Sequence, residues 1–164
     1  MDSFNEAMLE YRKQLANGQI QKAYKGLMDY MLGLKTHFKD QYPGYFVSGS
    51  LYYGYMDMTY FAIIPESMKQ RNLKIALVFN HEAFRFEAWL AGYNKQVQTK
   101  YWQFFKASGW NKYSLVPDTK GEDAILVHVL VDIPDFSNLA SLTAQLERET
   151  LAFISDIEIF LSKP

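Results

Sequence analysis

The sequence contains no cysteine among its 164 residues, which excludes disulfides, thiolate metal ligands and a thiol nucleophile. It also has little net charge: the formal value is −1 at pH 7, so the basic footprint of a nucleic-acid-binding protein is missing. The longest apolar stretch, AILVHVLV at 124–131, is too short to span a bilayer. The opening MDSFNEAMLEYRK lacks the apolar run of a signal peptide. We therefore expect a cytoplasmic protein that does not associate with membranes.

Motifs for phosphate binding, hydrolysis and metal binding are missing as well. Neither Gly-x-x-x-x-Gly-Lys-Ser/Thr nor Gly-x-Gly-x-x-Gly occurs, and GSLYYG at 49–54 lacks the residues that would hold phosphate. Ser48 and Ser50 do not stand in a Gly-x-Ser-x-Gly motif, and no histidine has HExxH spacing. The Glu-x-Lys pattern of restriction nucleases fails because Trp89, not lysine, stands two residues after Glu87. We predict no metal site and no cofactor.

Apolar residues at helical spacing predict four helices. Ser3 and Glu6 have the spacing of a capping box, and NG at 17–18 ends the first helix. The other predicted helices run from Ile20 to a stop at Pro43 and Gly44, from about Asn94 to Ser108, and from a cap at Ser137 through Phe160.

Four other segments have strand patterns: 55–64, 73–79, 83–91 and 124–131. Short polar links between the first three favour an antiparallel meander. The last is apolar on both sides except at His128, so we predict that it lies centrally in the sheet. The order α-α-β-β-β-α-β-α predicts one α+β domain over residues 1–164, with about four antiparallel strands and helices packed mainly on one face.

An aromatic content of 16% is high, and the segment GSLYYGYMDMTYF at 49–61 surrounds a single acid, Asp57, with aromatic rings. Alternation in the third strand places Arg85, Glu87 and Trp89 on one face, so Arg85 would pair with Asp57 if the two strands were near in the sheet. The alternative is a solvent-facing sheet surface, where such an ion pair contributes a few tenths of a kcal/mol to about 1 kcal/mol.

The candidate ligand site combines this face with the start of the following helix. Tyr55, Tyr60 and Trp89 would wall it, while Asn94 would cap the helix whose first turn, with Lys95, forms its rim. The complete candidate set is Tyr55, Asp57, Tyr60, Arg85, Glu87, Trp89, Asn94, Lys95 and His128.

Two histidines have different expected environments. His128 interrupts an apolar strand, so it is either a core histidine with a hydrogen-bond partner or a functional base or ligand. His81 and its neighbour Glu82 are predicted in a hairpin turn with both side chains pointing outward.

Three hypotheses for function remain open. The first is a non-enzymatic module that binds a small molecule, a protein or a second copy of the chain through its aromatic surface. The second is an enzyme acting on a small polar or anionic substrate, with Asp57 or Glu87 as acid/base and Arg85 orienting an anionic group. The third is a nucleic-acid-associated protein that uses the basic segment KQRNLK at 69–74, although the overall charge argues against nucleic acid.

Four segments of the sequence together resemble a family of small bacterial proteins described as a domain of unknown function. These segments are QKAYKGLMDYM, GYMDMTYF, KIALVFNHEAFRFEAWLAGYNKQ and KYWQFF. The resemblance covers nearly the whole chain. It implies a bacterial, cytoplasmic protein, and it implies no activity or catalytic residues.

Overall fold

Within residues 3–163, a computed structural model has five helices and six strands. Its elements are α1 (Phe4–Asn17), α2 (Gln19–Gln41), β1 (Phe46–Val47), β2 (Met58–Ile64), α3 (Glu66–Lys69), β3 (Leu73–Asn80), β4 (Arg85–Gly92), α4 (Lys95–Ala107), β5 (Ser114–Leu115), β6 (Leu126–Val131) and α5 (Leu139–Leu161). The chain forms two compact units, divided within α2 between Leu34 and Lys35.

The sheet belongs to the second unit and has the order β1-β2-β3-β4-β6-β5, with every pairing antiparallel. The predicted α+β class is therefore confirmed. The strand number exceeds the predicted four because β1 and β5 have two residues each, too few to show alternation in the sequence. The predicted loop at 65–72 contains α3, a helix of only four residues.

Two predictions about strand position were wrong. Strand β2 begins at Met58, so Tyr55 and Asp57 lie in the loop before it, where Met56 adopts a positive φ of 63°. Strand β6 is not central, because its outer neighbour β5 pairs with it only at Leu126 and Val127. The central strands are β3 and β4, which pair along their whole length from Leu73 opposite Gly92 to Asn80 opposite Arg85.

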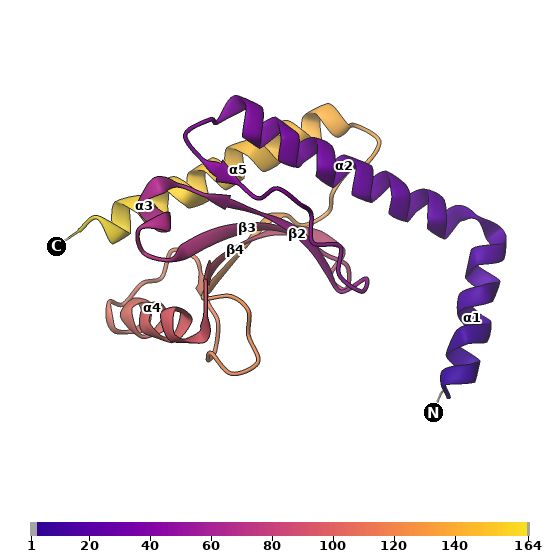
Figure 1. The fold of residues 1–164 in the computed structure, drawn as a ribbon, viewed down its shortest axis with the longest axis horizontal. Helices are drawn as coiled ribbons and strands as arrows, with labels where there is room; N and C mark the ends of the chain where they lie inside the picture. The colour runs from indigo at the N-terminus through magenta and orange to yellow at the C-terminus, as the bar shows by residue number, and fades with distance from the viewer. Residues whose placement is uncertain (1–2, 164) are drawn as a thin grey trace. The chain divides into compact units, whose positions relative to one another are not determined.

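Helices lie on both sides of the sheet but cover it unequally (Figure 1). The 23-residue α5 covers one face, where its Phe153 stacks on His128 of β6. The 13-residue α4 lies at one end of the other face, where Gln98 shares a cavity with Trp89 of β4. Helix packing in this unit is therefore mainly on one face, and the second face keeps open surface beside α4.

Successive side chains of β4 point alternately to the face covered by α5 and to the open face, as its alternation predicted. Phe86, Ala88 and Leu90 are fully buried on the α5 side. Glu87 and Trp89 point to the opposite face, which carries the cavity. The candidate site therefore depends on the polar half of one amphipathic strand.

Helix ends follow the local sequence closely. The capping box of Ser3 and Glu6 is formed, and Gly18 ends α1 in the left-handed conformation. The last helix differs from its prediction: Asn138 caps α5 by accepting from the Ser141 amide, whereas Ser137 bonds to Asp135. Asn and Ser are nearly equal as caps, so adjacent candidates are hard to separate by sequence.

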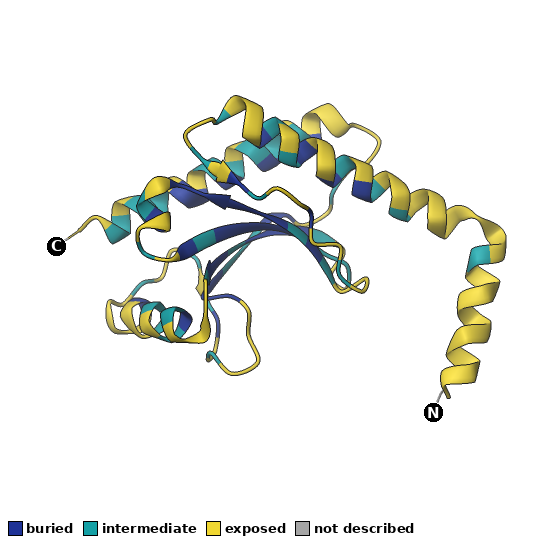
Figure 2. Ribbon diagram, in the orientation of Figure 1, coloured by how far each residue is buried: buried dark blue, intermediate teal, exposed yellow. Residues whose placement is uncertain are grey.

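In the first unit, α1 has no buried residue, and Figure 2 shows it exposed along nearly its whole length. Its apolar stripe is open as well, since Phe4 is 83% exposed. Helix α1 therefore derives little stability from packing within its own unit.

A pair of methionine substitutions compares the exposed helix α1 with the buried side of α3 in their contributions to stability. Met8→Ala in α1 is expected to change the free energy of unfolding by less than about 0.5 kcal/mol, because Met8 is 45% exposed. Met68→Ala in α3 is expected to cost about 2–5 kcal/mol, because Met68 has no exposed surface. Urea denaturation followed by circular dichroism measures both. Equal losses would show that α1 is packed in solution.

Candidate functional site

A cavity of about 440 Å³ lies on the open face of the sheet, and we name it the Trp89 cavity. Strands β2, β3 and β4, the start of α4 and the loop before β6 all contribute to it. Its lining residues are Tyr52, Met58, Tyr60, Lys74, Ala76, Trp89, Ala91, Gly92, Tyr93, Asn94, Lys95, Gln98 and Asp123.

The floor of the Trp89 cavity is made of small residues. Ala76 of β3 and Ala91 of β4 lie on the same face as Trp89, and their methyl groups leave the space that larger side chains would fill. At the end of β4, a Cβ on Gly92 would lie 2.7 Å from the Gln98 amide nitrogen. Gly92 therefore permits the close approach of α4, whose first turn Asn94 caps through the Val97 amide at 2.9 Å.

Aromatic rings stand around this floor. Tyr52 and Tyr60 exchange both backbone hydrogen bonds, and their rings lie 5.0 Å apart. Burial, the nearby Tyr52 and the Asp123 carboxylate raise the pKa of the Tyr60 hydroxyl, which therefore stays protonated at neutral pH. Trp89 stands on the neighbouring part of the sheet, so rings from β2 and β4 face the same space.

The Trp89 side chain is oriented by a hydrogen bond to the buried carboxylate of Glu87. Its Nε1 donates to Glu87 Oε1 at 2.9 Å, and Glu87 is only 2% exposed. Glu87 Oε2 accepts from Arg85 Nε at 2.7 Å and from Asn80 Nδ2 at 3.4 Å. The Glu87 hydrogen bond is the main cause of the raised pKa of Arg85, which also pairs with Asp132. This network satisfies the buried charge and fixes the indole in one orientation.

The charged groups around the Trp89 cavity differ in how they are bonded. Lys95 donates to the carbonyl oxygens of Thr119 at 2.5 Å and Glu122 at 2.9 Å, so it fastens the loop before β6 to α4. Gln98, which is 5% exposed, donates to the same Glu122 oxygen. The Lys74 ammonium instead lies over the Tyr60 ring, 5.9 Å from its centroid.

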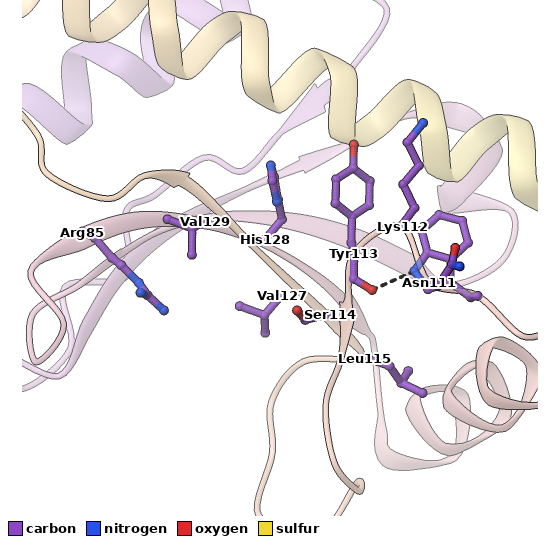
Figure 3. Close-up of a pocket in the computed structure, with 10 residues that line it drawn as sticks. Arg85, Asn111, Lys112, Tyr113, Ser114, Leu115, Val127, His128 and Val129 are labelled. Carbon is purple, nitrogen blue, oxygen red and sulfur yellow. Dashed lines mark hydrogen bonds between the residues drawn. The ribbon is translucent and has the colours of Figure 1, made fainter.

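A second cavity of about 630 Å³, the His128 cavity, lies at the β6 edge (Figure 3). It is lined by Arg85, Trp110, Asn111, Lys112, Tyr113, Ser114, Leu115, Val127, His128 and Val129. In Figure 3, His128 and Tyr113 point toward α5.

The basic side chains Lys112 and His128 of this cavity lie near carboxylates of the chain itself. Lys112 pairs with Asp156 at 3.0 Å, and His128 Nε2 lies 3.8 Å from Glu149. The His128 ring also packs on the Tyr113 ring, with 4.6 Å between their centroids.

The nine predicted site residues are thus distributed over three places. The Trp89 cavity is lined by four of them, Tyr60, Trp89, Asn94 and Lys95. A fifth, Glu87, does not line the cavity but accepts a hydrogen bond from Trp89. Arg85 and His128 line the other cavity. Tyr55 and Asp57 line neither of these two cavities.

Asp57 has a structural role in its loop. Its Oδ1 accepts from the backbone amides of Tyr55 at 2.9 Å and Met58 at 2.8 Å, and these hydrogen bonds lower the pKa of its carboxyl. It does not pair with Arg85, because β3 lies between β2 and β4 and Arg85 pairs with Glu87 and Asp132 instead. The constellation proposed for an enzyme therefore does not assemble in one cavity.

The other predicted groups also have local partners. His81 does not point outward: its Nε2 lies 2.8 Å from the buried Thr59 hydroxyl, and burial lowers its pKa. In the basic segment, Arg71 donates to the carbonyl oxygens of Ser67 and Leu161, and Lys74 turns into the Trp89 cavity. The segment therefore does not form one basic patch.

Within residues 3–163, no group of three or more His, Cys, Asp or Glu side chains could hold a metal ion. In the same described part of the chain, no helix combines the length and apolarity that crossing a membrane requires.

Sequence reasoning missed Ala76, Gln98 and Asp123, and considered Lys74 only as part of a basic segment. Lys74 and Ala76 alternate with buried residues in β3, so their shared face was recoverable from the period of two. Nothing local indicated that the loop carrying Asp123 closes the cavity, since this depends on bonds to α4 across 24 or more residues.

Comparisons with known proteins gave one match. A family model described as a domain of unknown function (DUF7000) matches residues 4–161, which span both compact units. No curated protein and no solved structure matches the chain.

Proposed function

We propose that this chain, which belongs to the DUF7000 family of unknown function, is a non-enzymatic small-molecule-binding module whose site is the Trp89 cavity. The observation that carries the proposal is the fixed orientation of Trp89 by the buried Glu87 carboxylate, beside a floor of small residues. Orienting a ring in advance reduces the entropy that a ligand must overcome on binding.

The lining of the cavity supports this proposal. Its volume of about 440 Å³ falls in the range of sites for small ligands, which combine apolar walls with a few convergent polar groups. Here Tyr60 and Trp89 provide ring faces, while Lys74, Gln98 and Asp123 provide polar groups. A flat ring lying on Ala76 and Ala91 would contact both aromatic walls.

The alternative of an acid/base enzyme lacks such support. Asp57 accepts hydrogen bonds from backbone amides outside both cavities. Glu87 already accepts hydrogen bonds from Arg85, Trp89 and Asn80. Neither carboxylate stands free in a concave site.

Binding of a neutral flat probe tests the proposal. We expect 1-naphthol, titrated at neutral pH, to shift the Trp89 indole N–H resonance in the NMR spectrum. The Trp102 N–H is an internal control, because it donates to Val116 O away from the cavity. Ala76→Leu fills the floor and should weaken binding at least about tenfold, whereas Ala140→Leu on the exposed surface of α5 should not.

Two results would contradict the proposal. One is a spectrum in which 1-naphthol leaves the Trp89 resonance unchanged up to its solubility limit. The other is equal affinity for the wild type and Ala76→Leu, provided that the variant keeps the wild-type amide spectrum outside the cavity.

A further inference from the structure

We propose that the ligand of the Trp89 cavity is an aromatic carboxylate, whose ring lies between Tyr60 and Trp89 and whose carboxylate is received by Lys74. This inference rests on the proposed function, because it specifies the chemical class that the same cavity accepts.

Lys74 is the cation of the cavity that remains available to a ligand. Among residues 3–163, no carboxylate lies within ion-pair distance of its ammonium. Its neighbour is the Tyr60 ring, and a separation of 5.9 Å is near the outer limit of a cation–π contact. Lys74 is a half-buried residue, and its ammonium, with so weak a partner, gains from an anion that enters the cavity.

The other charged groups do not take this role. Lys95 is already bonded to two carbonyl oxygens, and moving it would release the loop before β6. Asp123 carries the opposite charge, yet no ion pair joins it to Lys74 in the described part of the chain. Asp123 therefore selects against anions at its own side of the cavity and leaves Lys74 as the receiving group.

The register of the sheet sets the position of the carboxylate. Ala76 is opposite Trp89, and Lys74 is opposite Ala91, so the backbone of Lys74 lies two residues along the strands from that of Trp89. The Lys74 ammonium lies beside the Tyr60 ring, so a carboxylate on a short side arm of a bicyclic ring held between Tyr60 and Trp89 would meet it there.

A carboxylate fits better than a phosphate. Phosphate sites usually provide several backbone amides or a bidentate arginine. The Trp89 cavity offers one ammonium, and the Val97 and Gln98 amides near the start of α4 already donate to Asn94.

Three naphthalene probes with the same ring test the charge preference: neutral 1-naphthol, anionic 1-naphthylacetate and cationic 1-naphthylmethylamine. We expect the wild type to bind the carboxylate at least about tenfold more tightly than the amine. Lys74→Gln should abolish this preference while leaving 1-naphthol affinity within about twofold. Lys74→Arg should retain the preference, and Asp123→Asn should strengthen carboxylate binding.

Lys106→Gln is the matched control. Lys106 also lies over an aromatic ring, that of Trp102 at 4.8 Å, but it is outside the cavity. Its replacement should leave all three affinities unchanged.

The inference is overturned if the amine binds as tightly as the carboxylate, or if Lys74→Gln weakens all three probes equally. In both cases 1-naphthol binding at Trp89 would still uphold the proposed function. If none of the probes binds, the proposed function fails and the inference fails with it.

Discussion

Replacing Glu87 with alanine is expected to lower the free energy of unfolding by about 3–5 kcal/mol. The carboxylate is 2% exposed and accepts hydrogen bonds from Arg85, Trp89 and Asn80, so its removal leaves three donors without their acceptor. The Trp89 indole also loses the bond that orients it. Probe affinity at the Trp89 cavity should therefore fall together with stability.

Two further variants separate the loss of the Glu87 hydrogen bonds from the loss of side-chain volume and from the loss of an ion pair to Arg85. Glu87→Gln keeps the size of the side chain and one carbonyl acceptor, so it should cost less, about 1–3 kcal/mol. Asp132→Ala removes the exposed partner of Arg85 at 3.5 Å and should cost less than about 1 kcal/mol. Urea denaturation gives the stabilities, and the Trp89 N–H resonance reports the indole environment. A Glu87→Ala protein as stable as Asp132→Ala would refute the role assigned to this carboxylate.

Gly54→Ala is the second substitution with a large expected effect. Gly54 has φ 73°, and a Cβ there would lie 2.1 Å from the Met58 carbonyl oxygen. The new methyl group meets the Met58 backbone and also Asp57 Oδ1 at 2.7 Å, so the loop that carries Tyr55 and Asp57 must change shape. We expect the free energy of unfolding to fall by about 2–4 kcal/mol, from left-handed strain and the clash together.

Gly109→Ala provides the matched control. Gly109 has the same φ of 73°, but a Cβ there would meet nothing within 4 Å. Only the left-handed strain remains, so this variant should lose about 1–2 kcal/mol. Thermal and urea denaturation of the two variants measure the difference. If both lose the same amount, the close approach at Gly54 does not exist in solution.

The parts of the site that lie within one element were predictable from the sequence. Alternation in β4 placed Glu87 and Trp89 together, and the position of Asn94 after that strand predicted the cap of α4. Both depend on periodicity or on contacts within a few residues, which a single sequence displays directly.

The parts that depend on pairing between distant segments were not predictable. The expected contact of Asp57 with Arg85 required β2 and β4 to be neighbours, whereas the chain places β3 between them. Similarly, the closure of the cavity by the loop at Asp123 depends on bonds from Lys95 and Gln98, which no local pattern reveals. Strand order and loop docking are properties of the whole fold.

The division of the Trp89 cavity between sheet and loop has a consequence for ligand preference. Its floor, including Ala76 and Ala91, belongs to the central strands β3 and β4. Its wall at Asp123 is an exposed loop fastened to α4 through backbone carbonyl oxygens, so the fastening does not depend on the side chains of that loop. For the binding function proposed above, we therefore expect substitutions in this wall to change ligand preference without altering the strands that orient Trp89.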